Sequence, residues 1–267
     1  MAHRSEVIYD RVSTALARLK LARVADCLDT SAAEAATDKV TYLEFLDRLL
    51  TAEVAARAER DIALKTKLAH VPFVKTLDQF DVAAQPSVGE RQVRELATGR
   101  FIAPGENGLL LGPPGVGKTH LAIALGMTAI AQGISVYVLT LADLVEMLHR
   151  DLKEDRLAER LRTLCTPRLL ILDEMGYVPL DRVVAQFLFQ LVSRRYLKGS
   201  SIVTSNKSYG EWGDSVADHV LAAALLDRLL PVSTTLNIRS QSYRLREKRQ
   251  AGVFHGLPTT PLVTDAP

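Results

Sequence analysis

Cysteine is scarce in this chain, and the residues present lack the neighbours that a disulfide or a zinc site needs. Cys27 and Cys165 lie far apart in the 267 residues, and neither has a metal-ligand partner at a useful spacing. The six histidines are scattered as well. We therefore interpret both cysteines as reduced, buried thiols of a cytosolic protein, and we set a structural zinc site aside.

Long apolar runs and a strong net charge are also missing. No stretch approaches the roughly 20 apolar residues that span a bilayer, so we expect no contact with a membrane. The N-terminus carries His3, Arg4 and Glu6 and lacks the apolar core of a signal peptide, which predicts a cytoplasmic protein. The formal net charge of +2 is too small to indicate nucleic acid by itself, so any basic surface must be local.

Glycine and proline do not occur before Pro72, so nothing in this stretch interrupts a helix. Apolar residues from about Ser5 to Leu28 recur at helical spacing and predict one amphipathic helix. The small residues of 30–39 predict a connector, and a capping box that begins at Thr41 predicts a second helix to about residue 69. We expect residues 1–74 to form a helical N-terminal domain that binds DNA or a partner, or mediates assembly.

From residue 75 onward, apolar strand-like runs alternate with helical patterns. The strand-like runs are 109–111, 134–139, 169–172, 201–204 and 232–238. Because a helical pattern separates each run from the next, they predict a parallel five-stranded sheet covered by helices on both faces, an α/β fold. We place this domain at 75–250 and expect a disordered tail over 251–267.

Residues 112–119, GPPGVGKT, fit the phosphate-binding pattern G-x-x-x-x-G-K-[ST] between a strand-like run and a helix-like run. The glycines allow a tight curl in which successive backbone N–H groups and a helix N-terminus face one anion. Lys118 is expected to place its charge on the β- and γ-phosphates, and the Thr119 hydroxyl to bind Mg²⁺. The candidate ATP-binding residues are Gly112, Pro113, Pro114, Gly115, Val116, Gly117, Lys118, Thr119 and His120.

Two adjacent acids, Asp173 and Glu174, follow the buried run 169–172, and ligands of open α/β sheets bind beyond the carboxyl ends of strands. Asp173 is expected to hold Mg²⁺ through water, and Glu174 to orient and deprotonate the water that attacks the γ-phosphate. The alternative is a charged turn. Enough chain separates Lys118 from Asp173 to place a further strand between the two motif strands, as in ATPases that use a catalytic glutamate.

Two further polar residues have both a functional and a structural interpretation. Asn206 ends the run 201–204, where it either senses the γ-phosphate or attacking water, or forms an ordinary turn. Arg228 ends a predicted helix. There it either favours the helix dipole or acts in trans as a finger on ATP held by a neighbouring subunit.

Basic residues near both ends are the candidates for DNA contacts. Arg11 and Arg18 lie on the polar side of the first predicted helix, and Arg244 and Arg246 lie in the basic run 239–249, which Tyr243 interrupts. Such residues could track a phosphate backbone, or they could belong to ordinary solvated helices.

Taken in order, these motifs resemble the AAA+ ATPases and, within them, the IstB-like insertion-sequence transposition helpers, which are close to bacterial replicative helicase loaders. The likeness covers nearly the whole chain. The runs around Gly176-Tyr177 and Ser242-Tyr243-Arg244 are its more discriminating parts. Little chain follows the last predicted strand, so the helical lid of wider AAA+ proteins is expected to be short or absent, which leaves Arg244 and Arg246 as candidates for a second sensor arginine.

The resemblance implies an ATPase that uses ATP and Mg²⁺, assembles with copies of itself on double-stranded target DNA, and recruits or stimulates a cognate transposase. It implies the roles given above for Lys118, Thr119, Asp173, Glu174 and Asn206, with Arg228 acting in trans. A helicase loader, whose partner is a hexameric helicase, is the alternative that shares this core. The third hypothesis is a small-molecule kinase, which would transfer phosphate to a metabolite.

Overall fold

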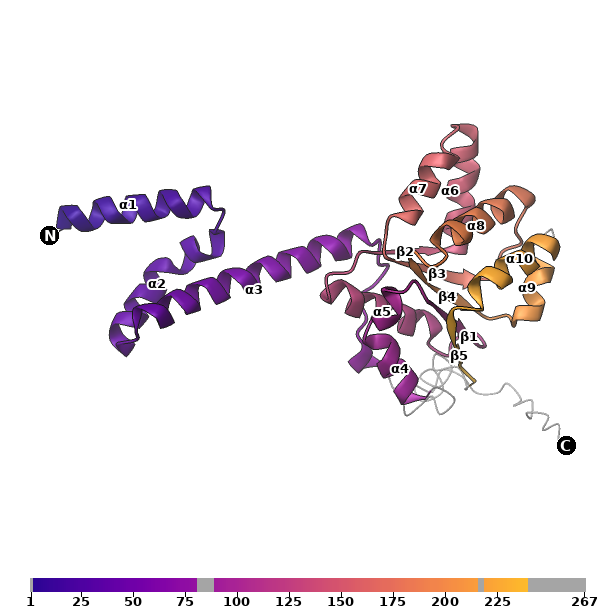
Figure 1. Cartoon of the computed structure of the whole chain (residues 1–267), viewed down its shortest axis with the longest axis horizontal. Coiled ribbons are helices and arrows are strands. Elements are labelled where there is room, and N and C mark those ends of the chain that lie inside the picture. The colour runs from indigo at the N-terminus through magenta and orange to yellow at the C-terminus, as the bar shows by residue number, and fades with distance from the viewer. Residues whose placement is uncertain (1, 81–88, 216–218, 240–267) are drawn as a thin grey trace, which may run out of the picture. The chain divides into compact units, whose positions relative to one another are not determined.

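The computed structural model describes residues 2–80, 89–215 and 219–239. By its internal packing the chain divides into two compact units, residues 1–64 and 65–267. The first unit is helical, and the second contains the sheet (Figure 1). Among the described residues, no helix has both the length and the apolar character that crossing a membrane requires.

The first unit holds α1 (Ala2–Arg18), α2 (Ala22–Asp38) and most of α3 (Tyr42–Leu68). The single helix predicted for Ser5 to Leu28 is wrong, because the chain turns at Lys20, whose φ of 55° is left-handed. The connector predicted for 30–39 is wrong as well. Its alanines continue α2, as their high helix propensity favours.

The predicted capping box at Thr41 is present at the start of α3. The Thr41 N–H donates to Glu44 Oε2 at 2.7 Å, and the Glu44 N–H donates back to Thr41 Oγ1 at 3.3 Å. Each residue therefore satisfies a backbone donor that the first helical turn leaves unpaired.

Glu53 of α3 joins the helices of the first unit. Its side chain is buried, and its carboxylate accepts from the backbone N–H groups of Arg23 and Val24 at 2.8 and 3.2 Å, in the first turn of α2. Arg57, one turn further along α3, donates to the same carboxylate at 2.9 Å. The apolar stripes predicted for this unit remain exposed instead of forming a core, including Ile8, Val12, Leu43, Leu46, Leu50 and Val54.

The sheet of the second unit has five strands in the order β2-β3-β4-β1-β5, all paired in parallel. The strands are β1 (Asn107–Leu111), β2 (Val136–Thr140), β3 (Leu169–Met175), β4 (Ser200–Ser205) and β5 (Ser233–Asn237). The predicted parallel sheet is confirmed, and the further strand that was predicted between the two motif strands, β1 and β3, is β4.

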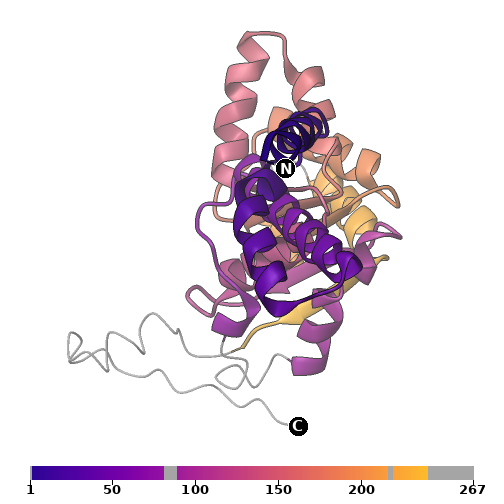
Figure 2. The same ribbon diagram turned by 90° about the vertical axis from the view of Figure 1, so that its left-hand side faces the viewer.

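Helices cover both faces of the sheet, as predicted. On one side lie α4 (Glu90–Ala97) and α5 (Lys118–Ala131); on the other lie α6 (Leu141–Lys153), α7 (Leu157–Cys165), α8 (Arg182–Arg195) and α10 (His219–Leu229). The perpendicular view agrees, with α6 and α7 on the side of the sheet opposite α4 (Figure 2). Three short elements complete the unit: 3-10 turns at Leu77–Gln79 and Arg100–Ile102, and α9 (Tyr209–Ser215).

Alternation along the strands separates the two apolar layers. Leu170, Leu172 and Val203 face the layer formed with α6, α8 and α10. Ile171 faces α5, where a Cβ added at Gly126 would lie 2.8 Å from its Cδ1. Burial on both faces explains why these strands are continuous apolar runs in the sequence.

Arg195, at the end of α8, is buried without a carboxylate among its described partners. Its Nη1 donates to the carbonyl oxygens of Leu164 and Pro167 at 3.0 and 2.8 Å, and its Nη2 donates to that of Arg168 at 3.3 Å. Burial lowers the pKa of Arg195 to about 10. The guanidinium thus satisfies carbonyl groups where α7 leads into β3.

Some predictions fall outside the described residues. These are Arg244, Arg246 and the tail over 251–267. The prediction of a short or absent lid concerns the chain after β5, of which residues 240–267 are outside the description.

Candidate nucleotide-binding site

The loop between β1 and α5 curls tightly, and its glycines are required by its backbone. Gly115 and Gly117 have φ values of 83° and 94°, which side-chain-bearing residues rarely adopt. Gly112 has a φ of 149°, and a Cβ there would lie 2.1 Å from the carbonyl oxygen of Ile238, just beyond β5. The sequence pattern therefore gives the conformation that a phosphate-binding loop needs.

Lys118 is the first residue of α5, and its side chain is almost fully buried. Its Nζ donates to the carbonyl oxygens of Gly112 and Pro113 at 2.7 and 2.8 Å. The ammonium thus lies against the inside of the loop, at a helix N-terminus, where backbone N–H groups and the helix dipole both favour an anion.

Asp173 of β3 lies behind this loop and connects two hydroxyl groups. Its side chain is 6% exposed, and its Oδ1 accepts from Thr119 Oγ1 at 3.0 Å and from Thr204 Oγ1. Thr119 comes from the first turn of α5, and Thr204 from β4. Three elements therefore bring a carboxylate and two hydroxyls together beside the loop.

Glu174 differs from its neighbour in both backbone and exposure. β3 does not end at Leu172, as the sequence predicted, but runs through both acids to Met175. Glu174 has a left-handed φ of 62° and an exposed side chain, and its N–H donates to Thr204 Oγ1 at 3.0 Å. A non-glycine residue in this conformation stores strain, and such strain is concentrated at functional sites.

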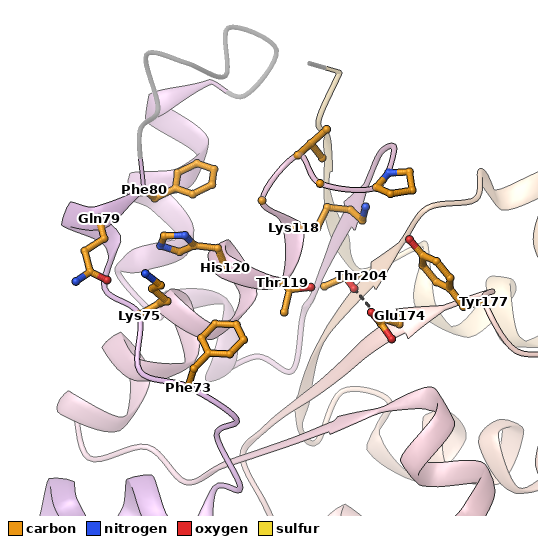
Figure 3. A pocket seen from close by; sticks show the side chains of 14 residues that line it. Phe73, Lys75, Gln79, Phe80, Lys118, Thr119, His120, Glu174, Tyr177 and Thr204 are labelled. Carbon is orange, nitrogen blue, oxygen red and sulfur yellow. Dashed lines mark hydrogen bonds between the residues drawn. The ribbon is translucent and has the colours of Figure 1, made fainter. Parts of the chain in front are cut away.

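A cavity of about 290 Å³ lies over these residues. Figure 3 shows its two ends: Phe73, Lys75, Gln79, Phe80 and His120 on one side of Thr119, and Glu174, Tyr177 and Thr204 on the other. One end therefore presents aromatic rings, and the other a carboxylate and hydroxyls. Pro114 to His120 line the space between them.

His120 contacts the aromatic end of the cavity. Its Nε2 lies 3.3 Å from the carbonyl oxygen of Thr76, and the His120 and Phe80 rings form a T-shaped pair with centroids 5.5 Å apart. Burial lowers the pKa of His120 below its ordinary value of 6.5, and the Lys75 charge lowers it further against the opposing effect of the Thr76 contact.

The structure does not bring every predicted residue to this cavity. Asn206 follows β4 and does not line the cavity, yet its Oδ1 is buried without a hydrogen-bond partner among the described residues. Arg228, in the last turn of α10, is exposed, and its guanidinium carbon lies 5.3 Å from the centre of the Tyr196 ring. Gly112 and Pro113 contribute carbonyl groups to Lys118 rather than cavity surface.

Sequence reasoning missed several cavity residues. Thr204 was overlooked because it lies in an apolar strand next to the more conspicuous Asn206. Tyr177 belongs to one of the runs that carried the family resemblance, which was a usable signal. Phe73 and Lys75 gave none. Cys27 and Cys165, expected to be buried, are free and partly exposed.

Comparison with known proteins supports the ATPase interpretation of this site. The family model of the IstB-like ATP binding protein matches residues 14–251. A Geobacillus stearothermophilus protein named as the ATP-binding protein of insertion sequence IS5376 is 50% identical over 240 residues, covering 90% of this chain and 96% of its own length. Its counterpart named for insertion sequence IS21 in Pseudomonas aeruginosa is 47% identical over 250 residues, covering 94% of each chain.

Solved structures share the fold at lower identity. DnaI is 21% identical with a TM-score of 0.54, over 61% of this chain and 90% of its own. DnaA from Aquifex aeolicus, solved with AMPPCP, is 20% identical with a TM-score of 0.54, over 69% of this chain and 57% of its own. The chain therefore belongs to the family of IstB-like ATP-binding proteins.

Proposed function

We propose that this protein is an ATP-dependent DNA-binding regulator of transposition. It assembles with copies of itself on double-stranded target DNA, hydrolyses ATP, and recruits or stimulates a cognate transposase. The observation that carries the proposal is a cavity containing Lys118, Thr119 and Glu174, with Asp173 bonded behind it, in a chain whose close relatives are named for insertion sequences.

The residues present fit ATP and Mg²⁺. The loop N–H groups and the Lys118 ammonium suit the phosphates, and the aromatic end of the cavity suits the base. The Thr119 hydroxyl and Asp173 would hold Mg²⁺, the aspartate through water, and the bound ion would neutralise charge on the β- and γ-oxygens. The buried Asn206 Oδ1 without a partner marks a polar position that a water molecule could satisfy.

In the proposed reaction the side chains act on a water molecule beside the γ-phosphate. The Glu174 carboxylate orients this water and accepts its proton, because it is exposed to the cavity while Asp173 is already occupied by two hydroxyl donors. Lys118 stabilises charge on the phosphate oxygens. Asn206 follows β4 outside the lining of the cavity, and its proposed role is that of a sensor of the γ-phosphate or of the attacking water.

Arg228 would complete the site of a neighbouring subunit. It lies on the exposed last turn of α10 and does not line the cavity of its own chain. A finger supplied in trans would couple ATP turnover to assembly, since a lone copy lacks that charge at its site.

We assign DNA or partner binding and assembly to residues 1–74. Arg11 and Arg18 are exposed and seven positions apart on α1, so both lie on one side of the helix, where they could follow a phosphate backbone. Arg244 and Arg246 remain candidates from the sequence alone. The relatives named for insertion sequences favour a transposase partner over the hexameric helicase of the loader alternative.

The test measures ATP turnover and DNA affinity together. Duplex DNA should raise the rate of ATP hydrolysis, and affinity for DNA should fall steeply with salt. Replacing both Arg11 and Arg18 by alanine should reduce the slope of log affinity against log salt by about 2, whereas the exposed pair Lys153 and Arg162, treated alike, should leave it unchanged. A flat salt dependence, or turnover indifferent to duplex DNA, would contradict DNA binding.

The partner requires its own measurement. The purified protein with ATP and DNA should raise strand transfer by its cognate transposase. Stable capture of a hexameric replicative helicase, without an effect on strand transfer, would favour the loader.

A further inference from the structure

The two acids of the site stand opposite a single residue of the neighbouring strand. In the pairing of β3 with β4, Leu172 is level with Val203 and Met175 is level with Ser205. Asp173 and Glu174 therefore both face Thr204, which makes the site a β-bulge. Bulges re-aim side chains and are common beside active sites.

The Thr204 hydroxyl bonds to both acids at this bulge. It donates to Asp173 Oδ1 and accepts from the Glu174 N–H at 3.0 Å, and Figure 3 shows the second of these bonds. Thr204 is 1% exposed, so both bonds are shielded from water. The next residue of β4 also bonds to β3 through its side chain, since Ser205 Oγ donates to the Met175 carbonyl oxygen at 2.6 Å.

These bonds bear directly on the conformation of Glu174. Its φ of 62° is unfavourable for a residue with a Cβ, so the surrounding structure must hold it there. The Thr204 hydroxyl is the hydrogen-bond partner that the structure gives the Glu174 N–H. Without it that N–H would lose its partner in a shielded place, and the strained backbone would lose one of its restraints.

We propose that Thr204 is a positioning residue for ATP hydrolysis, whose hydroxyl holds Glu174 in the left-handed conformation that directs its carboxylate into the cavity. It acts through Glu174. The inference rests on the proposed role of Glu174, and it is separate from the sensor role assigned to Asn206, two residues further along.

The experiment compares Thr204→Val with Thr204→Ser in the full-length protein. Valine keeps the shape and removes the hydroxyl, whereas serine keeps the hydroxyl. Thr204→Val should lower kcat by about 10²-fold, because a catalytic group misplaced by about 1 Å has effects of that size. Its affinity for ATP should stay within about twofold of the wild type, since Thr119 still bonds Asp173, and Thr204→Ser should keep kcat within about threefold.

Thr128→Val is the matched control. It removes a hydroxyl that bonds the Ala124 carbonyl oxygen at 2.9 Å within α5, and it should leave kcat unchanged. Thermal unfolding of each variant shows whether it is folded at the assay temperature. If Thr204→Val is unfolded at the assay temperature, Thr204→Ala replaces it, because alanine also lacks the hydroxyl and puts no methyl group in its place. The kcat and ATP affinity expected for Thr204→Val are then expected for Thr204→Ala.

Three results would overturn the inference: wild-type kcat in Thr204→Val, equal loss of kcat in the valine and serine variants, or a loss of ATP affinity as large as the loss of kcat. Glu174→Gln, measured alongside, separates this inference from the function on which it rests. Normal turnover in Glu174→Gln would refute the catalytic role of Glu174. An inactive Glu174→Gln with a fully active Thr204→Val would refute only the role of Thr204.

Discussion

Thr119 and Asp173 are 54 positions apart in the chain, and the hydroxyl of the first donates to Oδ1 of the second at 3.0 Å. The bond joins the start of α5 to β3, so two of the groups assigned to Mg²⁺ already lie beside each other. Assembling them needs no rearrangement of the sheet. The parallel sheet makes this possible, because it brings the ends of β1, β3 and β4 to one edge.

Lys118→Ala should weaken ATP binding by at least about 10²-fold, because the variant lacks a charged donor for the phosphates. Titration with a fluorescent ATP analogue gives the Kd directly. Lys153→Ala, which removes an exposed lysine from α6, is the control and should bind as the wild type does. A Kd within about twofold of the wild type in Lys118→Ala would refute the phosphate role of this lysine.

Arg228→Ala should lower ATP turnover by about 10³-fold or more if the arginine acts in trans, as arginine fingers do in related chemistry. Mixing it with Glu174→Gln should restore part of the activity, because some sites then combine an intact Glu174 with a neighbour's intact Arg228. Arg162→Ala, an exposed arginine in the last turn of α7, is the control. Normal turnover in Arg228→Ala, under conditions where Lys118→Ala is inactive, would exclude the finger.

Arg195→Met should lower the free energy of unfolding by about 3 kcal/mol, because it leaves buried carbonyl groups without donors. Urea denaturation followed by circular dichroism measures this loss. Arg194→Met, at the preceding position, is the comparison. Equal stability of the two variants would mean that the contacts of Arg195 contribute nothing measurable.

The stability of the nucleotide-free protein should depend on pH through His120. Its pKa is lowered in the folded protein, so the unfolded chain takes up the proton first. The contribution of the neutral ring is therefore complete above the ordinary pKa of 6.5 and is lost as the pH falls through the lower, folded value. When the pH is lowered from about 7.5 to about 5.5, the midpoint temperature of thermal unfolding should fall further for the wild type than for His120→Asn. Equal falls would show that His120 is not involved.

The sequence predicted β1 and the first part of β3 well because these strands are buried on both faces and contain uninterrupted apolar runs. Where a strand contains polar residues, the apolar pattern predicted its end wrongly. β3 was expected to end at Leu172, but it continues through Asp173 and Glu174 to Met175. A periodicity of apolar residues does not register a bulge, and so it gave no sign that Thr204 contacts both acids.

The break between α1 and α2 is a turn that the sequence pattern did not predict. Lys20 turns the chain with a left-handed φ, although neither glycine nor proline marks the position. Its neighbours continue the helical spacing, and the turn is held by contacts from distant residues: Arg57 of α3 donates to the carbonyl oxygens of Leu19 and Lys20. Local propensity cannot reveal a turn that tertiary contacts impose.

The close approach of Ile238 to Gly112 couples the chain after β5 to the start of the candidate phosphate loop. The Ile238 N–H donates to the Leu111 carbonyl oxygen at 2.7 Å, and its own carbonyl oxygen occupies the space that a side chain at position 112 would fill. A force on the chain after β5 is therefore transmitted to Gly112, the first residue of the phosphate loop, through the direct contact with Ile238. A displacement of Ile238 would therefore act directly on the loop that is proposed to hold the phosphates of ATP.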